Sequence, residues 1–338
     1  MQTLYRRLLG ILPRIGVQVV DIGPGTALVF RRGERTVVPV GPGADLVGRG
    51  KGRYVVTDAG KDIWVVARGS SKRGVRTVPL GDTGARLLLD EAVPAEAERE
   101  FQLAASHYLC AQHVAALLEL NRVNVVFDVG ANTGQYGKGL RRFGYTGRIV
   151  SFEPVAATFA KLRTSAESDP DWHVYNFALG REEAVRSIHV DWKSMNSLLP
   201  PSEYGKERYR RFAKGRTEEI EIRRLDDVMQ KALEGVEDPR PYLKMDTQGF
   251  DMEVFAGAGD RIAEFVGMQS EVAALQLYEG SPGMAEAVAA YEAAGFGVTG
   301  MYPVTREPAT GRVVEFDCVM MRPEPATPPA TSGSSRPG

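Results

Sequence analysis

The sequence predicts an α/β protein with a doubly wound, mostly parallel sheet, preceded by a small β-rich region. From residue 123 onward, short β-forming runs alternate with stretches of helical spacing, which is the order of a parallel sheet. A tight glycine turn, Gly130 to Gly134, follows the first of these runs, as in Rossmann-like folds. The last two expected strands have no helix between them, so the last strand should be antiparallel.

Short β-like runs alternate with Gly and Pro in residues 1–92, which predicts a small all-β unit. The sequence assigns no role to this unit. Residues 19–26 resemble a cofactor loop, but β-formers follow them, so a hairpin is expected. Residues 1–92 carry 15 Lys and Arg against 8 Asp and Glu, whereas the remainder carries 27 against 35. The two parts therefore suit docking on each other or an acidic partner of the first part, and the acidic main body argues against nucleic acid.

Residues 93–322 should form the main domain. A helix is expected at 94–120 because its apolar residues recur at helical spacing. Strands are expected at 124–128, 148–152, 172–176, 242–246, 265–271, 297–302 and 313–320. Further helices are expected at 134–143, 155–168, 225–233, 249–256 and 282–294, around a polar region at 185–224. The tail at 323–338, rich in Pro, Ser, Thr and Gly, should be disordered.

The glycine turn predicts a cofactor site. It reads Asp-x-Gly-x-x-x-Gly, from Asp128 to Gly134, and lacks the third close glycine of a dinucleotide fingerprint. This wider loop resembles the first motif of S-adenosylmethionine-dependent methyltransferases. Glu153 ends the second strand, where an acid can hold two ribose hydroxyls. The expected cofactor-binding residues are Asp128, Gly130, Asn132, Gly134, Glu153, Asn176 and Ala178.

Two carboxylates are the candidate catalytic residues. Asp246 and Glu271 end two expected strands, and a hydroxyl acceptor needs a general base near the donor. Asp246 suits equally the N-cap of the helix at 249–256, and Glu271 suits a structural partnership with Lys244 or a backbone amide. The pair also has the oxygen ligands that Mg²⁺ prefers, but no further carboxylate is clearly placed, so no metal site is assigned.

Four segments resemble the FkbM family of methyltransferases, over about residues 101–322. They are Phe127–Tyr136, Ser151–Pro154, Leu243–Ala258 and Ser270–Gly280. The third and fourth are the more specific, because generic methyltransferases lack them. The resemblance implies O-methylation of a hydroxyl on a sugar, glycolipid or secondary metabolite, with a small-molecule or glycan- or lipid-linked acceptor. An NAD-dependent oxidoreductase and a non-catalytic binding module are the alternatives.

Composition agrees with an ordinary globular protein, because 43% of the 338 residues are hydrophobic and 25% are charged. The two cysteines, Cys110 and Cys318, lie far apart and have no metal-ligand spacing, which suits a reducing cytoplasm. No apolar run is long enough to span a bilayer. The sequence therefore predicts a cytoplasmic enzyme without a membrane span.

Overall fold

The computed structural model describes residues 17–23, 26–31, 53–58, 64–69, 75–79, 86–90 and 95–323. The chain divides into two compact units, Met1–Phe101 and Gln102–Gly338. The strand-like run at 36–40 and the tail from residue 324 lie outside the described residues.

The described strands of the N-terminal unit pair as antiparallel hairpins. The glycine-rich residues 19–26 belong to the first of these, which confirms that this loop is a hairpin turn. The final strand of the unit was not predicted. The pairs are β1 (Val17–Gly23) with β2 (Thr26–Arg31), β3 (Arg53–Asp58) with β4 (Trp64–Gly69), and β5 (Val75–Pro79) with β6 (Arg86–Asp90).

The C-terminal unit is built on a seven-stranded sheet in the order β15-β16-β14-β13-β7-β8-β9. The strands are β7 (Val125–Val129), β8 (Arg148–Phe152), β9 (Trp172–Tyr175), β13 (Pro241–Met245), β14 (Gly267–Ala273), β15 (Gly297–Arg306) and β16 (Val313–Met321). β7, β8, β9, β13 and β14 are parallel, and β16 is antiparallel to both its neighbours. The last strand is antiparallel as predicted, although it lies one position inside the edge, which β15 forms.

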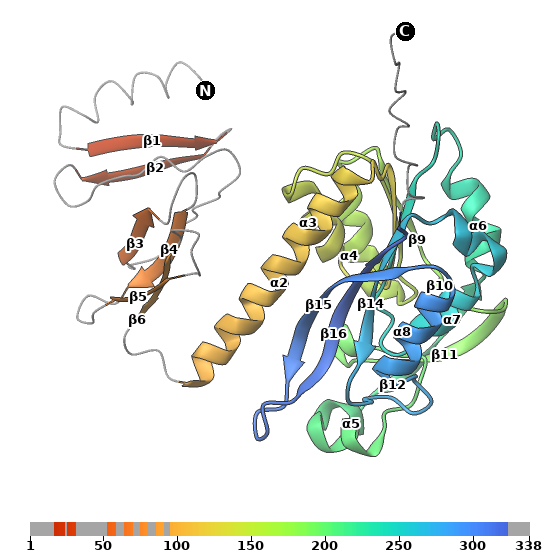
Figure 1. The fold of residues 1–338 in the computed structure, drawn as a ribbon. Helices are drawn as coiled ribbons and strands as arrows, with labels where there is room; N and C mark the ends of the chain where they lie inside the picture. Colours follow the sequence, from red (N-terminus) through yellow and green to blue (C-terminus); the bar gives the residue numbers. More distant parts are fainter. Residues whose placement is uncertain are drawn as a thin grey trace, which may run out of the picture. The chain divides into compact units, whose positions relative to one another are not determined.

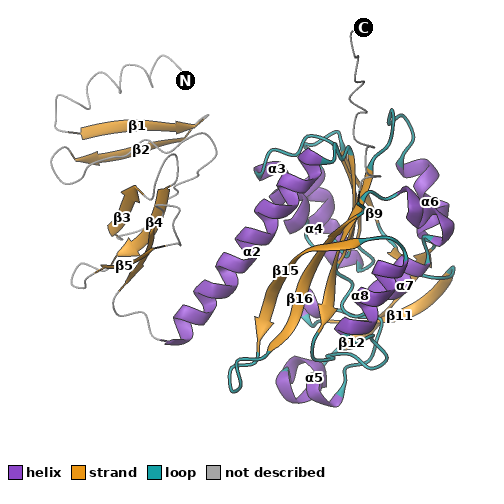
Figure 2. Ribbon diagram, viewed as in Figure 1, coloured by secondary structure: helices purple, strands orange, loops and turns teal. Residues whose placement is uncertain are grey.

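Helices cover both faces of this sheet (Figures 1 and 2). α2 (Ala95–Leu120), α3 (Gln135–Arg142) and α4 (Ala156–Ala166) pack on one face, around Val126 and Tyr242. α6 (Leu225–Ala232), α7 (Asp251–Ala256) and α8 (Met284–Ala293) pack on the other, around Phe127 and Leu243. Neighbouring residues of one strand therefore serve opposite cores, because side chains alternate along a strand.

The polar region predicted at 185–224 forms a second, three-stranded sheet. β12 (Arg216–Arg223) pairs in parallel with β10 (Ala178–Leu179) and antiparallel with β11 (Ala184–Val190). The connection between β11 and β12 carries the short helix α5 (Glu203–Arg208). This sheet has its own apolar core, around Ile188 and Ile222.

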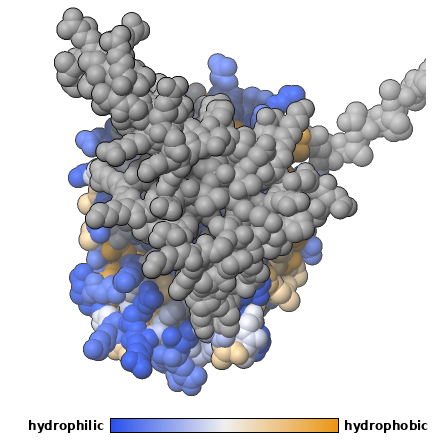
Figure 3. All heavy atoms as spheres, turned by 90° about the vertical axis from the view of Figure 1, so that its left-hand side faces the viewer, coloured by the Kyte–Doolittle hydropathy of each residue, from blue (hydrophilic) through white to orange (hydrophobic). Residues whose placement is uncertain are grey.

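On the face that Figure 3 shows, hydrophilic side chains cover much of the coloured surface, and apolar ones form small patches. Across the ranges that the structure describes, no helix combines the length and apolar character needed to cross a bilayer.

Candidate active site

A cavity of about 730 Å³ opens beside the carboxyl ends of β7, β8, β13 and β14. This is where open α/β sheets bind ligands, and the volume lies within the usual range for ligand pockets. Of the residues predicted from the sequence, the cavity is lined by Gly130, Asn132, Glu153, Ala178, Asp246 and Glu271.

Three predicted cofactor residues do not line the cavity but stand behind its walls. Asp128 is fully buried, and its Oδ2 accepts a hydrogen bond from Ser151 Oγ at 3.0 Å. Gly134, at the N-cap of α3, is packed against Trp172 and α4. Asn176 Nδ2 donates to the backbone carbonyls of Glu153 and Pro154, at 2.9 Å each. These residues brace the cavity, so a direct contact with a cofactor stays a prediction for them.

Gly130 brings the ends of β7 and β13 together. Its φ of +74° is one that glycine adopts at little cost, and an added Cβ would lie 2.0 Å from the carbonyl oxygen of Asp246. A side chain here would therefore push the two strand ends apart. Gly130 was predicted to bind the cofactor. In the structure, its lack of a side chain allows the backbone of Asp246 to pack against it.

Glu153 is held by the backbone of two loops. Its Oε2 accepts from the Asn132 amide at 3.0 Å, and its Oε1 accepts from the Val155 amide at 2.9 Å. Burial, with 7% of the residue exposed, raises the pKa of Glu153 to about 7, although the two amides act to lower it. The carboxyl is thus fixed in place at the cavity wall and titrates near neutrality.

Lys244 is a site residue that the sequence reading treated only as a possible partner of Glu271. It lies on the same face of β13 as the core residue Tyr242, and its Nζ is 3.0 Å from Asp128 Oδ1 and 3.8 Å from Asp246 Oδ2. Burial acts to lower the pKa of Lys244, but the neighbouring carboxylates outweigh burial and raise the pKa above its ordinary value. The group is therefore charged. A lone lysine inside an otherwise apolar strand was the available signal, since a buried charge needs a partner.

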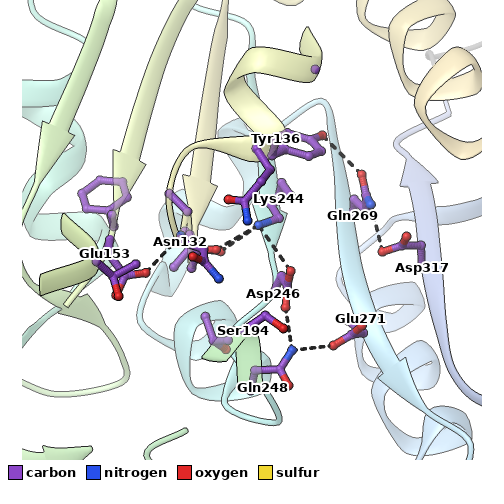
Figure 4. A pocket seen from close by; sticks show the side chains of 18 of the residues that line it. Asn132, Tyr136, Glu153, Ser194, Lys244, Asp246, Gln248, Gln269, Glu271 and Asp317 are labelled. Carbon is purple, nitrogen blue, oxygen red and sulfur yellow. Dashed lines mark hydrogen bonds and ion pairs between the residues drawn. The ribbon is translucent and has the colours of Figure 1, made fainter. Parts of the chain in front are cut away.

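The carboxylates of Asp246 and Glu271 meet at the side chain of Gln248 (Figure 4). Asp246 directly follows β13 as predicted, whereas Glu271 lies inside β14 and not at its end, because pairing with β16 continues to Ala273. Gln248 Nε2 lies 2.9 Å from Asp246 Oδ1 and 2.9 Å from Glu271 Oε2. Asp246 is not a helix cap, because α7 begins at Asp251 with Phe250 as its N-cap. The side chain of Asp246 is 42% exposed and lines the cavity, as a base must.

A buried carboxylate, Asp251, ties the β13–α7 loop to β14. Its Oδ1 accepts from the Thr247 amide at 2.8 Å and also from the Thr247 hydroxyl. Its Oδ2 accepts from Ser270 Oγ at 2.7 Å and from the Glu271 amide at 3.2 Å. Asp251 therefore fixes the separation of the segments that carry Asp246 and Glu271, a role that the sequence reading missed.

The opposite end of the cavity is apolar. Its wall comes from the start of α4, from the second sheet and from the loop before α7, with lining residues Val155, Ala178, Leu179, Ile188, Leu198 and Phe250. Ser194 and Asn196 also line the cavity. An apolar slot next to a few polar groups is the usual form of a small-molecule site and suits a flat aromatic ring.

Within the described residues, no group of three or more His, Cys, Asp or Glu side chains has an arrangement that could hold a metal ion.

A sequence model of the FkbM methyltransferase domain matches residues 128–297, half of the chain. The chain belongs to this family. The match includes the glycine turn, Glu153, Lys244, Asp246 and Glu271. Membership of the FkbM family decides for an S-adenosylmethionine-dependent methyltransferase, against both the oxidoreductase and the non-catalytic module.

Solved methyltransferase structures resemble this FkbM protein. Aeropyrum pernix fibrillarin, solved with natively bound S-adenosyl-L-methionine, is 12% identical with a TM-score of 0.38, over 80% of this chain and 100% of that one. The O-methyltransferase of Bacillus cereus, in complex with SAH, is 12% identical with a TM-score of 0.36, over 69% and 94%. The search of curated proteins gives no match.

The residues of this FkbM domain fit S-adenosylmethionine. The apolar end around Val155 and Ala178 suits adenine, and the Glu153 carboxyl, which also lines the cavity, suits the hydroxyls of a ribose. At the other end, the carboxylate of Asp246 suits a cationic sulfur, and Lys244 suits a carboxylate.

Proposed function

We propose that this protein transfers a methyl group from S-adenosylmethionine to a hydroxyl of a small-molecule or glycan- or lipid-linked acceptor, with Asp246 as the general base. One observation carries the proposal: a partly exposed carboxylate, Asp246, lines the same cavity as the glycine turn and Glu153. The proposed base and the proposed ribose-binding group thus face a common space.

The cofactor-binding groups have distinct tasks in this proposal. S-adenosylmethionine, when bound, supplies a methyl group already activated by a sulfonium. Glu153 accepts hydrogen bonds from the ribose, and Lys244 pairs with the carboxylate of the methionine portion. Asp128 keeps Lys244 charged and in place from behind the wall. Such alignment of donor and acceptor can supply roughly 7–11 kcal/mol of a barrier.

Asp246 removes the proton that makes the acceptor hydroxyl a poor nucleophile. The acceptor oxygen forms a bond to the methyl carbon as the carbon–sulfur bond breaks, and the hydroxyl proton passes to the Asp246 carboxylate. Lys244 Nζ lies 3.8 Å from Asp246 Oδ2 and helps to hold the base in place. General bases of this kind contribute about 10²–10⁴-fold to the rate.

Calorimetry with S-adenosylmethionine and with NAD tests the cofactor part. We expect the first to bind and the second not to bind; binding of NAD alone would overturn the proposal. Incubation with labelled donor and a cell extract of glycolipids and metabolites, followed by mass spectrometry, identifies the acceptor.

The variant Asp246→Asn tests the base. Turnover should fall by about 10²–10⁴-fold while cofactor affinity stays close to that of the wild type. The matched control is Asp260→Asn, which changes an exposed aspartate outside the cavity lining. Equal turnover of Asp246→Asn and the control would remove Asp246 as the base.

A further inference from the structure

We propose that Gln248 is a positioning residue that holds Asp246 and Glu271 as one unit with a single negative charge. In this unit, Asp246 carries the charge and Glu271 keeps its proton. The inference rests on the proposed function, because it divides the roles within the same site.

The side chain of Gln248 is placed to serve both carboxyls at once. Its Nε2 carries two hydrogens, and carboxyl oxygens of Asp246 and Glu271 each lie 2.9 Å from that nitrogen. The Tyr278 hydroxyl lies 2.9 Å from Gln248 Oε1, which turns the amide nitrogen toward the two acids. Figure 4 shows Gln248 between the two side chains.

The backbone of Gln248 is also held in a special conformation. Its φ is +56°, in the left-handed region, which costs a non-glycine residue free energy. Ser197 Oγ donates to the Gln248 carbonyl at 2.7 Å, which ties this turn to the second sheet. The fold thus maintains a strained turn whose side chain contacts both candidate bases.

The surroundings of the two acids differ. Asp246 has the Lys244 ammonium at 3.8 Å and a side chain that is 42% exposed. In the part of the chain that the structure describes, no lysine or arginine forms an ion pair with Glu271. The charged groups around Glu271 are all acids, namely Asp246, Asp251, Glu315 and Asp317, and the Tyr278 ring packs nearby.

Electrostatics therefore favours one charge, on Asp246. Two carboxylates that share a donor repel each other, and the one without a cation keeps its proton. Burial, followed by the charges of Glu315 and Asp246, raises the pKa of Glu271 well above its ordinary value. A protonated Glu271 does not compete for the acceptor proton, which leaves Asp246 as the base.

The variant Glu271→Gln tests the location of the proton, because glutamine imitates a protonated glutamate. A carboxyl whose pKa is raised in the folded protein, such as Glu271, contributes its full stabilisation below the pKa of the unfolded state, about 4.3. This stabilisation is lost as the pH rises through the pKa of the folded state. The wild-type melting temperature should therefore fall between pH 5 and pH 8. In Glu271→Gln the fall should be shallower, with melting at pH 8 at least about 2–4 °C higher.

The control is Glu207→Gln, at an exposed glutamate of α5, which should leave this profile unchanged. A Glu271→Gln protein that melts lower than the wild type at pH 8, or with an equal dependence on pH, would show that Glu271 is ionised and would overturn the inference.

Gln248→Asn tests the positioning role, since asparagine tolerates a positive φ but has a shorter reach. Asp246 would lose the donor that holds its carboxylate, so kcat should fall by up to about 10²-fold through misplacement of the base. The KM for S-adenosylmethionine and its affinity should stay close to those of the wild type, which a general loss of structure would not allow. Gln112→Asn, on an exposed face of α2, is the control.

The two levels of proposal fail separately. A wild-type protein that binds no S-adenosylmethionine overturns the proposed function. A protein that binds it, but whose Gln248→Asn variant keeps the wild-type kcat, overturns only the role of Gln248.

Discussion

Glu153 and Glu271 line the two ends of one cavity, and their surroundings are opposite. Two backbone amides donate to Glu153, whereas acidic side chains surround Glu271. Burial raises the pKa of both, to about 7 at Glu153 and well above the ordinary value at Glu271, where like charges add to the effect. Burial is the largest cause at both acids; the amide donors oppose it at Glu153, and the neighbouring acids add to it at Glu271.

Lys244→Met should have the largest effect, because Lys244 lies between the two ends and pairs with the fully buried Asp128. An unpaired buried charge costs about 3–5 kcal/mol of unfolding free energy. Urea denaturation measures this, with the exposed Lys161→Met as control. The double variant with Asp128→Asn should recover part of the loss. A cost below about 1 kcal/mol would mean that the pair is not buried as described.

Gly130→Ala should have the second-largest effect on the free energy of unfolding. The added Cβ would push Asp246, at the end of β13, away from the glycine turn that follows β7. Gly144→Ala is a matched control: its φ is also positive, +89°, but no atom lies within 4 Å of the added Cβ. Gly130→Ala should therefore lose about 1–3 kcal/mol more in denaturation than Gly144→Ala. Equal losses would show that backbone strain alone matters at Gly130.

Glu153→Gln sharpens the comparison at the cofactor end. Loss of charged hydrogen bonds to the ribose, worth about 1.5–3 kcal/mol, should weaken S-adenosylmethionine binding by about 10–100-fold. Glu271→Gln, at the other end, should leave this affinity close to that of the wild type. Calorimetry measures the affinity of both variants for S-adenosylmethionine. If only Glu271→Gln bound it more weakly, then Glu271, and not Glu153, would lie at the cofactor end.

The pH dependence of cofactor binding should show the smallest effect. The pKa of Glu153 is raised to about 7, so its anionic form decreases as the pH falls through this value. Affinity should fall by about tenfold between pH 8 and pH 6 in the wild type and stay level in Glu153→Gln. The contribution of Glu153 to the free energy of unfolding has the opposite trend. It is complete below about pH 4.3 and is lost as the pH rises through 7.

Much of the fold and several residues of the candidate site could be predicted because their signals are local. The glycine turn after β7, the acid after β8 and the carboxylate after β13 all stand where a β-forming run ends. The paired strands β13 and β14, which carry Asp246 and Glu271, lie side by side as expected. The β-forming residues after Thr26 distinguished the hairpin of β1 and β2 from a cofactor loop.

Other roles could not be predicted, since they depend on contacts between distant segments. The pairing of Asp128 with Lys244, 116 positions further along the chain and on the same face of the sheet, was not predicted. In the sequence, Gln248 is an ordinary polar residue after a strand. Its role depends on contact with Glu271 of β14, which the fold places beside it.

Local sequence was enough to place the strands of the large sheet and the polar residues that follow β7, β8 and β13, because strand propensity and glycine turns act over a few residues. Which of these groups are charged, and which face the cavity, followed from the folded arrangement. Protonation and orientation depend on neighbours that the sheet brings together, and those neighbours are far apart along the chain.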